Sequence, residues 1–348
     1  MLLLKTAPGI EDILSQEAAR ILGCKVMERR PGRIICCGED SWAVENLYPL
    51  LKTAHSIYRV LVQAPVSREK SGLAQMREYA GLVDWEKIIP WSSTYAVRGE
   101  RIGGGHQYTS MEVAAAVGEE IYNSLSSKGH VFRVSLNSPS ISIGAMVVED
   151  NFILALRLYG EESLHRRWYR LYSHHAALKP SLAAAMLYLA GVRDGGVLLD
   201  PMCGGGTIAI EAALMHEHIK IICSDSSPKS IRMAMLNAAM ARVRDRILFK
   251  TAPVSQLPIT LGVKADAIVT NPPYGIRMGG PGKARKALED LFHSSQKLLD
   301  ENGLLVLITP HRGWAMEDAG KTGFRLLEER RVLHGNLYAW IMVFSREK

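Results

Sequence analysis

The pattern of apolar and polar positions changes character near residue 179. Before that point, apolar residues recur at helical spacing over 10–22 and alternate with polar residues over 152–158, but the elements follow no regular order. After it, short apolar strands and amphipathic helices alternate strictly. The first part therefore predicts small α+β domains, and the second predicts a doubly wound, mostly parallel α/β sheet. The expected division is 1–65, 66–162, a linker at 163–178, and 179–348.

The second part contains apolar runs that predict parallel strands at 197–199, 220–223, 247–249, 267–269 and 303–308. Two further strands flank Gly335-Asn336, a pair typical of a hairpin, so we expect one antiparallel strand inserted at the edge of the sheet. In the first part, Ser110 is expected to cap a helix with the apolar residues Val113 and Val117.

The most informative turn follows the expected strand at 267–269 and reads Asn271-Pro272-Pro273-Tyr274. The two prolines fix φ and remove backbone donors, so neither a helix nor a strand ladder continues through them. The turn offers several acceptors and few donors, which suits an exocyclic NH2 group, and Tyr274 can stack on the base that carries this amine. The alternative is an ordinary strand exit with a turn glycine.

A second turn, Asp200 to Thr207, joins the first strand of the alternating part to its first helix and contains three consecutive glycines. Glycines at this place let a ligand approach the backbone and the helix N-terminus. No Gly-Lys-Ser/Thr follows these glycines, which argues against an NTPase loop, and they are contiguous instead of spaced as Gly-x-Gly-x-x-Gly, which argues against an NAD site. Asp200 suits the ammonium of S-adenosylmethionine, and Asp225, at the end of the second strand, suits a ribose diol.

Two segments of the first part and the linker are candidates for phosphate contacts. Gly103-Gly104-Gly105 precedes His106 and an expected helix, and it is either a phosphate cradle or a flexible loop. The segment 162–170 combines arginines with two aromatic residues, and it is either a solvated linker or a patch that contacts phosphates and stacks on bases.

Composition narrows the class of protein without identifying it. Lys and Arg number 42 against 35 Asp and Glu, a net charge of +7 that favours polyanionic partners. The five cysteines form no CxxC pair, as expected of reduced intracellular thiols, and no residue pattern indicates a metal site. No apolar run has the length of a membrane span, so we expect a soluble cytoplasmic protein.

These motifs together carry a resemblance. Asp200 to Thr207 resembles the S-adenosylmethionine motif of class I methyltransferases, and Asn271 to Tyr274 resembles the Asn-Pro-Pro-Tyr motif of enzymes that methylate exocyclic amines of nucleobases. Four further stretches are similar to the THUMP-domain RNA methyltransferases: His106 to Ser110, Leu136 to Pro139, Ser163 to Arg167 and Leu178 to Ala185. Within that family, the chain looks most like the tRNA guanine-N2 methyltransferases that act at acceptor-stem position 6.

The resemblance implies a ferredoxin-like domain at 1–65, a THUMP domain at 66–162 and a Rossmann-fold methyltransferase domain at 179–348. It also implies a monomer that binds tRNA and uses S-adenosylmethionine without a metal. The implied catalytic residues are Asn271, Pro272 and Tyr274. The implied cofactor-binding residues are Asp200, Met202, Cys203, Gly204, Gly206, Thr207, Asp225, Ser226 and Asn271. The implied RNA-binding residues are Arg98, His106, Arg166 and Arg167.

Two positions depart from the family pattern. The acidic residue that usually holds the adenine amine after the third strand is missing, because Phe249 is followed by Lys250 and Thr251. Trp168 stands where the linker motif has glycine. The alternatives that remain are a guanine-N2 methyltransferase of tRNA position 10 or of ribosomal RNA, and an RNA-binding protein with a degenerate cofactor site.

Overall fold

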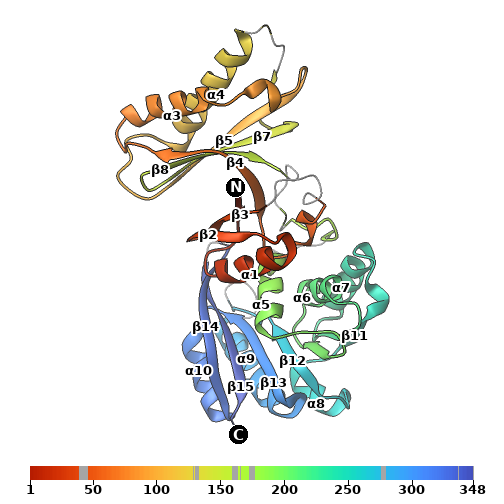
Figure 1. The fold of residues 1–348 in the computed structure, drawn as a ribbon. Coiled ribbons are helices and arrows are strands. Elements are labelled where there is room, and N and C mark those ends of the chain that lie inside the picture. The colour runs from red at the N-terminus through yellow and green to blue at the C-terminus, as the bar shows by residue number, and fades with distance from the viewer. Residues whose placement is uncertain are drawn as a thin grey trace. The chain divides into compact units, whose positions relative to one another are not determined.

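The computed structural model forms two compact units, one made of Met1–Lys5 and Ala18–Leu164 and the other of Thr6–Glu17 and His165–Lys348 (Figure 1). The structure describes the whole chain except 39–45, 128, 130–132, 159–163, 165, 172–176, 276–279, 336 and 348. Much of the linker expected at 163–178 therefore lies outside the described residues. None of the described helices combines the length and the apolar character needed to cross a membrane.

The first unit is built on one mixed sheet, in which eight strands fall within the described residues, in the order β2-β3-β1-β4-β8-β7-β5-β6. Their bounds are β1 Leu2–Lys5, β2 Lys25–Arg30, β3 Arg33–Cys37, β4 Ser56–Pro65, β5 Thr94–Ile102, β6 Arg133–Val134, β7 Ile141–Val148 and β8 Asn151–Arg157. Antiparallel pairing of β4 with β8 makes the sheet continuous through residues that the sequence pattern assigns to two domains.

Helices α3 (Ser71–Gly81) and α4 (Ser110–Ser126) pack on this sheet around buried aromatic residues that include Trp85 and Phe152 (Figure 1). The N-cap of α4 is Thr109, not Ser110 as the sequence predicts. The Thr109 hydroxyl accepts from the Glu112 amide (3.2 Å), and the Glu112 carboxylate accepts from the Thr109 amide (2.8 Å). This reciprocal capping box satisfies two backbone donors, which is why the helix begins at this place.

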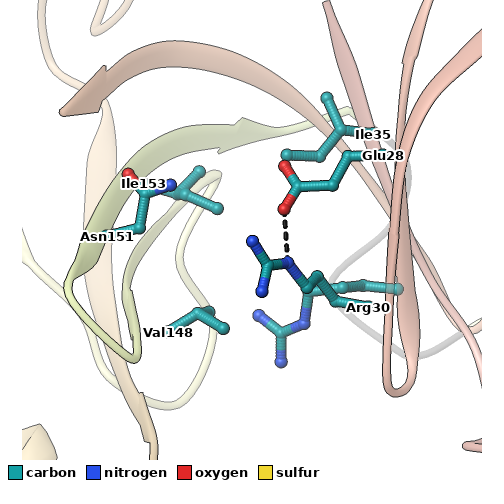
Figure 2. A pocket seen from close by; sticks show the side chains of 7 residues that line it. Glu28, Arg30, Ile35, Val148, Asn151 and Ile153 are labelled. Carbon is teal, nitrogen blue, oxygen red and sulfur yellow. Dashed lines mark hydrogen bonds and ion pairs between the residues drawn. The ribbon is translucent and has the colours of Figure 1, made fainter. Parts of the chain in front are cut away.

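A small pocket of about 20 Å³ lies between β2, β3, β7 and β8, and Figure 2 shows Arg30 paired with Glu28 beside it. Arg33 also lines the pocket and is buried, and its Nη2 donates to Glu100 at 2.8 Å. A volume of this size holds roughly one water molecule. It is too small for a nucleotide.

The second unit contains the doubly wound sheet that the alternating pattern predicts, with seven strands among its described residues in the order β11-β10-β9-β12-β13-β15-β14. The bounds are β9 Val197–Asp200, β10 Lys220–Asp225, β11 Ile247–Thr251, β12 Ala265–Thr270, β13 Leu299–Thr309, β14 Phe324–His334 and β15 Leu337–Arg346. All neighbours are parallel except β15, which is antiparallel to both β13 and β14. The predicted fold class is confirmed.

Successive strand residues bury opposite faces of this sheet. Leu198 joins the core beneath α5 (Pro180–Leu189), α6 (Thr207–Met215) and α7 (Pro228–Met240), whereas Leu199 joins the core beneath α8 (Leu257–Thr260), α9 (Gly280–Leu298) and α10 (Arg312–Lys321). The apolar pattern does not predict α10. Its buried apolar residues are only Ala315 and Ala319, which give a weak signal of helical periodicity.

The first turns of α1 (Glu11–Leu22) also belong to the second unit, although the sequence pattern places them in the N-terminal domain. Ile10 and Ile13 are buried in the same core as α5. The Tyr188 hydroxyl donates to Glu17 Oε1 at 3.0 Å, and Arg330 pairs with Asp12. The segment Thr6–Glu17 thus completes one face of the sheet that the rest of the second unit builds.

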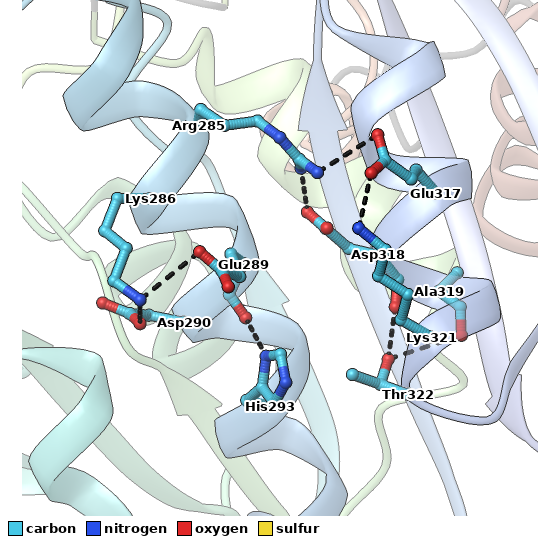
Figure 3. A network of polar contacts seen from close by, with 10 residues as sticks. All are labelled: Arg285, Lys286, Glu289, Asp290, His293, Glu317, Asp318, Ala319, Lys321 and Thr322. Carbon is cyan, nitrogen blue, oxygen red and sulfur yellow. Dashed lines mark hydrogen bonds and ion pairs between the residues drawn. The ribbon is translucent and has the colours of Figure 1, made fainter.

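A network of charged residues joins α9 to α10 on the face of the sheet that these two helices and α8 cover (Figure 3). Arg285 of α9 pairs with the buried carboxylate of Asp318 and, at 3.2 Å, with Glu317. The Thr322 hydroxyl donates to the Asp318 carbonyl at 2.6 Å and closes the end of α10. Helix α9 comes after β12 along the chain, and α10 comes after β13.

Candidate active site

The carboxyl ends of three adjacent strands bring the sequence-predicted residues together. β9 lies between β10 and β12 in the sheet, and these strands end at Asp200, Asp225 and Thr270, the residue before Asn271. Parallel neighbours end on the same edge, where doubly wound folds bind their ligands. The glycine loop, Asp225 and the Asn271 turn therefore share one edge, as the sequence predicts.

Asp200 is a buried carboxylate that neutral donors hold in place. Its Oδ1 accepts from the Thr270 hydroxyl at 2.8 Å and from the Met202 amide at 3.3 Å, and the residue is 1% exposed. No cationic side chain in the described parts of the chain forms an ion pair with it. Burial raises the pKa of Asp200 to about 7, and the Asp225 charge adds to this rise, while the two hydrogen bonds oppose it. A cationic ligand would supply the charge that this carboxylate lacks.

The glycine loop is shaped by backbone conformation and by close packing. Gly204 and Gly206 have positive φ values of 52° and 80°, and a Cβ on Gly206 would lie 3.0 Å from the Ala234 Cβ. The side-chain amide of Asn237 donates from Nδ2 to the Gly205 carbonyl at 3.0 Å. Helix α6 starts at Thr207, so its first N–H groups point out of the loop. The loop can therefore hold an uncharged or anionic part of a ligand close to the backbone.

Cys203 lies in the loop but is not available as a nucleophile. Its amide donates to the Ser224 carbonyl at 2.8 Å, and its side chain is buried. Burial raises the pKa of the thiol, so the thiol stays protonated. Cys203 packs the loop against the end of β10.

Asp225 presents a carboxylate that is oriented by the backbone and remains partly exposed. Its Oδ2 accepts from the Gly204 amide at 2.9 Å, and its Oδ1 accepts from the Ser227 amide at 2.8 Å. Each oxygen keeps a second lone pair, which suits a vicinal diol. Ser226 beside it is exposed. After β11 the chain passes through Ala252, whose amide donates to the Asp225 carbonyl at 3.0 Å.

The Asn271 turn holds an acceptor without a partner. Asn271 Oδ1 is buried, and within the part of the chain that the structure describes it accepts no hydrogen bond. An unmet buried acceptor is unfavourable by about 1–3 kcal/mol, so a donor from a ligand is expected to meet it. Pro272 is buried and Pro273 is exposed. The acceptor-rich turn that the sequence predicts is therefore present, and its side-chain acceptor is free to bind an N–H group.

Tyr274 is held by two histidines that sequence reasoning missed. Its carbonyl lies 2.9 Å from His311 Nε2, and its hydroxyl lies 3.1 Å from His334 Nδ1, with the Tyr274 and His334 rings at 86°. These histidines are 37 and 60 residues from Tyr274 along the chain. No spacing rule connects residues so far apart, and only the order of the strands brings them together.

A hollow of about 350 Å³ lies at the opposite edge of the sheet, among the amino ends of the strands. It is lined by Gly196, Asp266 and Asn302, among others, and Asp266 accepts from the Val197 amide at 2.7 Å. None of the residues that the sequence predicts for the site lines this hollow. The carboxyl edge remains the candidate site.

Comparisons with known proteins agree with this geometry. The RMKL-like methyltransferase domain matches residues 167–339, and the THUMP domain matches residues 70–157. A tRNA (guanine(6)-N2)-methyltransferase of Archaeoglobus fulgidus is 31% identical, over 97% of this chain and 90% of that protein. The chain belongs to the THUMP-domain RNA methyltransferases. The resemblance that the motifs indicate is confirmed.

Two further proteins bear on the fold and on the site of action. The crystal structure of TrmN from Thermus thermophilus matches with a TM-score of 0.85 and 26% identity over 99% of each chain. A tRNA (guanine(10)-N2)-dimethyltransferase of Methanothermobacter thermautotrophicus is 27% identical, over 80% of this chain and 77% of that protein. The match to TrmN thus spans both the methyltransferase and the THUMP parts of this chain.

Within the THUMP region, Arg98 and His106 are already engaged in local contacts. Arg98 is exposed, and its Nη2 donates to the Leu136 carbonyl at 2.5 Å, while His106 Nε2 lies 2.7 Å from the Glu149 carbonyl. A Cβ on Gly103 would lie 2.8 Å from the Glu149 carboxylate, and Arg68 binds Glu149 and Asp150. Carboxylates beside the glycines favour a structural loop over a phosphate cradle.

At the start of the second unit's main segment, Arg167 differs from its neighbour Arg166. The Arg167 guanidinium donates to both oxygens of Glu211 at 3.0 and 3.1 Å, and its side chain is only 9% exposed. Glu211 is fully buried and also accepts from the Tyr169 hydroxyl at 2.7 Å. Arg166 and Trp168 are exposed. Arg167 therefore anchors the segment to α6 and is ill placed for the phosphate contact expected from the sequence, whereas Arg166 is free to make it.

Proposed function

We propose that this protein transfers the methyl group of S-adenosylmethionine to the N2 amine of a guanine in tRNA, at position 6 of the acceptor stem. The observation that carries the proposal is the buried Oδ1 of Asn271, which has no hydrogen-bond partner among the described residues. Asn271 directly follows Thr270, whose hydroxyl donates to Asp200. One hydrogen bond thus links a site for a cation to a site for an amine. S-Adenosylmethionine supplies an electrophilic methyl group at its sulfonium.

The residues at the carboxyl edge fit the parts of this cofactor. Asp200 would bind the ammonium, because a buried carboxylate without a cationic partner gains most from a positive charge. Asp225 would bind the ribose hydroxyls, and the loop at Gly204 and Gly206 would lie along the cofactor. Met202, Cys203, Thr207 and Ser226 complete the proposed cofactor-binding set.

The Asn271 turn would prepare the target amine. The guanine N2 lone pair is delocalised into the ring, so the amine is a weak nucleophile. Asn271 Oδ1 and the Pro272 carbonyl would accept hydrogen bonds from its two N–H groups and favour the transition state, in which positive charge develops on nitrogen. Tyr274 would contact the base, which must leave its helix to reach the turn. Asn271 acts as an acceptor and orienting group, not as a base.

The choice of nucleotide rests on the relatives. The relative that acts on guanine 6 is aligned over 97% of this chain and the relative that acts on guanine 10 over 80%, at 31% and 27% identity. The higher identity and the fuller match support position 6. Arg98, His106 and Arg166 are the proposed RNA contacts.

The test is methylation of a tRNA transcript with purified protein, followed by mass spectrometry of nuclease fragments. We expect one added methyl group on guanine 6. Methylation at guanine 10 or in ribosomal RNA would contradict the assignment of the site. Binding of tRNA without any methylation, together with no heat of binding for S-adenosylmethionine, would identify a non-catalytic RNA-binding protein instead.

Asn271→Ala tests the role of the turn. Loss of an acceptor that acts chiefly in the transition state should lower the single-turnover rate by roughly 10²-fold or more. The dissociation constant for the cofactor should change little. Asn302→Ala, an exposed asparagine at the opposite edge of the sheet, is the matched control and should keep the full rate. A near-normal rate in Asn271→Ala would contradict the proposed chemistry.

A further inference from the structure

Two histidines hold the Asn271 turn from separate elements. His311 follows β13 by two residues and precedes α10, and its amide donates to the Thr309 hydroxyl at 3.1 Å. His334 is the last residue of β14. In the sheet, β13 is next to β12, and β14 is separated from β13 by β15. The ends of β13 and β14 lie on the same edge as the end of β12, so the two histidines reach Tyr274 from different strands. The turn is therefore supported beyond its own backbone.

The partners of each ring determine which nitrogen carries the proton. The Tyr274 carbonyl can only accept, so the His311 Nε2 that lies 2.9 Å away must be the donor. The Ala177 carbonyl can likewise only accept, so His334 Nε2, at 3.4 Å, carries a proton. In neutral His334, Nδ1 then accepts from the Tyr274 hydroxyl at 3.1 Å. The two contacts thus have opposite polarity: His311 donates to Tyr274 and His334 accepts from it.

The surroundings of both rings favour these arrangements. His334 is 9% exposed, and burial together with the nearby charges of Lys179 and Arg170 lowers its pKa, which keeps it neutral. The His311 ring stacks on Trp314 with centroids 4.0 Å apart and planes at 16°. The Arg285 guanidinium lies over Trp314 at 5.9 Å, so the α9–α10 network also supports His311.

We propose that His311 and His334 are positioning residues that clamp Tyr274 from its carbonyl and its hydroxyl, so that the Asn271 acceptor and the target amine meet in a productive geometry. The inference rests on the proposed function. Among the described residues, the hydrogen bonds and ring contacts of the two histidines involve Tyr274, Thr309, Trp314 and Ala177, and none of the predicted cofactor-binding residues. Their loss should therefore reduce the rate at saturating substrates and leave cofactor affinity unchanged.

The opposite polarity of the two contacts predicts opposite patterns of rescue. The side-chain amide atoms of asparagine occupy about the same position as Nδ1 of histidine. Those of glutamine occupy about the same position as Nε2. His334→Asn should keep the contact with Tyr274, whereas His334→Gln should lose it. His311→Gln should keep a donor to the Tyr274 carbonyl, whereas His311→Asn should lose it.

The measurement is the single-turnover rate at saturating tRNA and S-adenosylmethionine, with cofactor affinity from calorimetry. We expect losses of about tenfold in His334→Gln and His311→Asn, since misplacement of a reacting group is costly, and near-normal rates in His334→Asn and His311→Gln. Tyr274→Phe combined with His334→Gln should be no slower than the slower single variant. Thermal unfolding confirms that each variant is folded.

Three results would overturn the inference. Equal rates in the asparagine and glutamine variants at both positions would show that the hydrogen bonds do not matter. Additive losses in the double variant would show that His334 does not act through Tyr274. Loss of cofactor affinity in parallel with rate would indicate a general structural role.

A wild-type protein without methyltransferase activity would instead contradict the proposed function. The clamp itself would then be tested by NMR, in which Tyr274→Phe should shift the His334 imidazole resonances and unchanged resonances would refute the contact.

Discussion

The burial of Asp200 predicts that cofactor binding depends on pH near neutrality. Burial raises the pKa of this carboxyl to about 7 in the free protein. Its proposed partner, the cofactor ammonium, binds only the ionised form. Below pH 7 the carboxyl carries a proton that must leave on binding, so affinity should fall as pH decreases. An ordinary exposed aspartate, whose pKa is near 4, would stay ionised over the same range of pH.

The size of the effect follows from the fraction of Asp200 that is ionised. A pKa of about 7 leaves roughly one-tenth ionised at pH 6 and about three-quarters at pH 7.5. The cofactor amine, with a pKa of about 7.8, is slightly less protonated at the higher pH and offsets part of the gain. The dissociation constant should therefore be roughly five- to eightfold larger at pH 6 than at pH 7.5.

Isothermal titration calorimetry measures both the affinity for the cofactor and the number of protons released when it binds. Titrations at pH 6 in two buffers with different ionisation enthalpies should show release of roughly 0.9 proton per cofactor bound. Asp200→Asn should bind more weakly at pH 7.5 and lose the pH dependence. Asp300→Asn, an exposed carboxylate on β13, is the matched control and should behave as wild type. A constant affinity between pH 6 and 7.5, or proton release that persists in Asp200→Asn, would refute the reasoning.

Two further predictions concern the segment around Arg167. Glu211→Ala should lower the free energy of unfolding by about 3–5 kcal/mol in urea titrations, because it removes the carboxylate that pairs with the buried Arg167 guanidinium. Glu289→Ala, which removes an exposed pair with Lys286, should change it by less than about 0.5 kcal/mol, and equal effects would contradict the structural role of Glu211. Arg166→Ala should reduce the slope of log affinity for tRNA against log salt by about one while leaving stability unchanged. An unaltered slope would remove Arg166 from the RNA contacts.

The sequence by itself determined the features that depend on neighbouring residues. Strict alternation of strands and helices after residue 179 determined the doubly wound sheet, because each unit buries its own apolar face. The loop from Asp200 to Thr207 and the turn from Asn271 to Tyr274 are equally local, because glycine and proline shape a backbone wherever it stands. Family membership followed from these motifs.

Only the tertiary structure decided which polar groups have partners. Arg166 and Arg167 are adjacent and alike in sequence, yet one is exposed and the other is paired with Glu211, 44 residues away. The contact of Tyr274 with His334 and the membership of Thr6–Glu17 in the second unit are similarly remote. Such contacts depend on strand order and on how the chain returns to an edge of the sheet, and neither leaves a periodic trace in the sequence. Burial and hydrogen bonding arise only once those distant segments have packed together. They set the pKa of Asp200, and among the described residues they leave the Oδ1 of Asn271 without a hydrogen-bond partner.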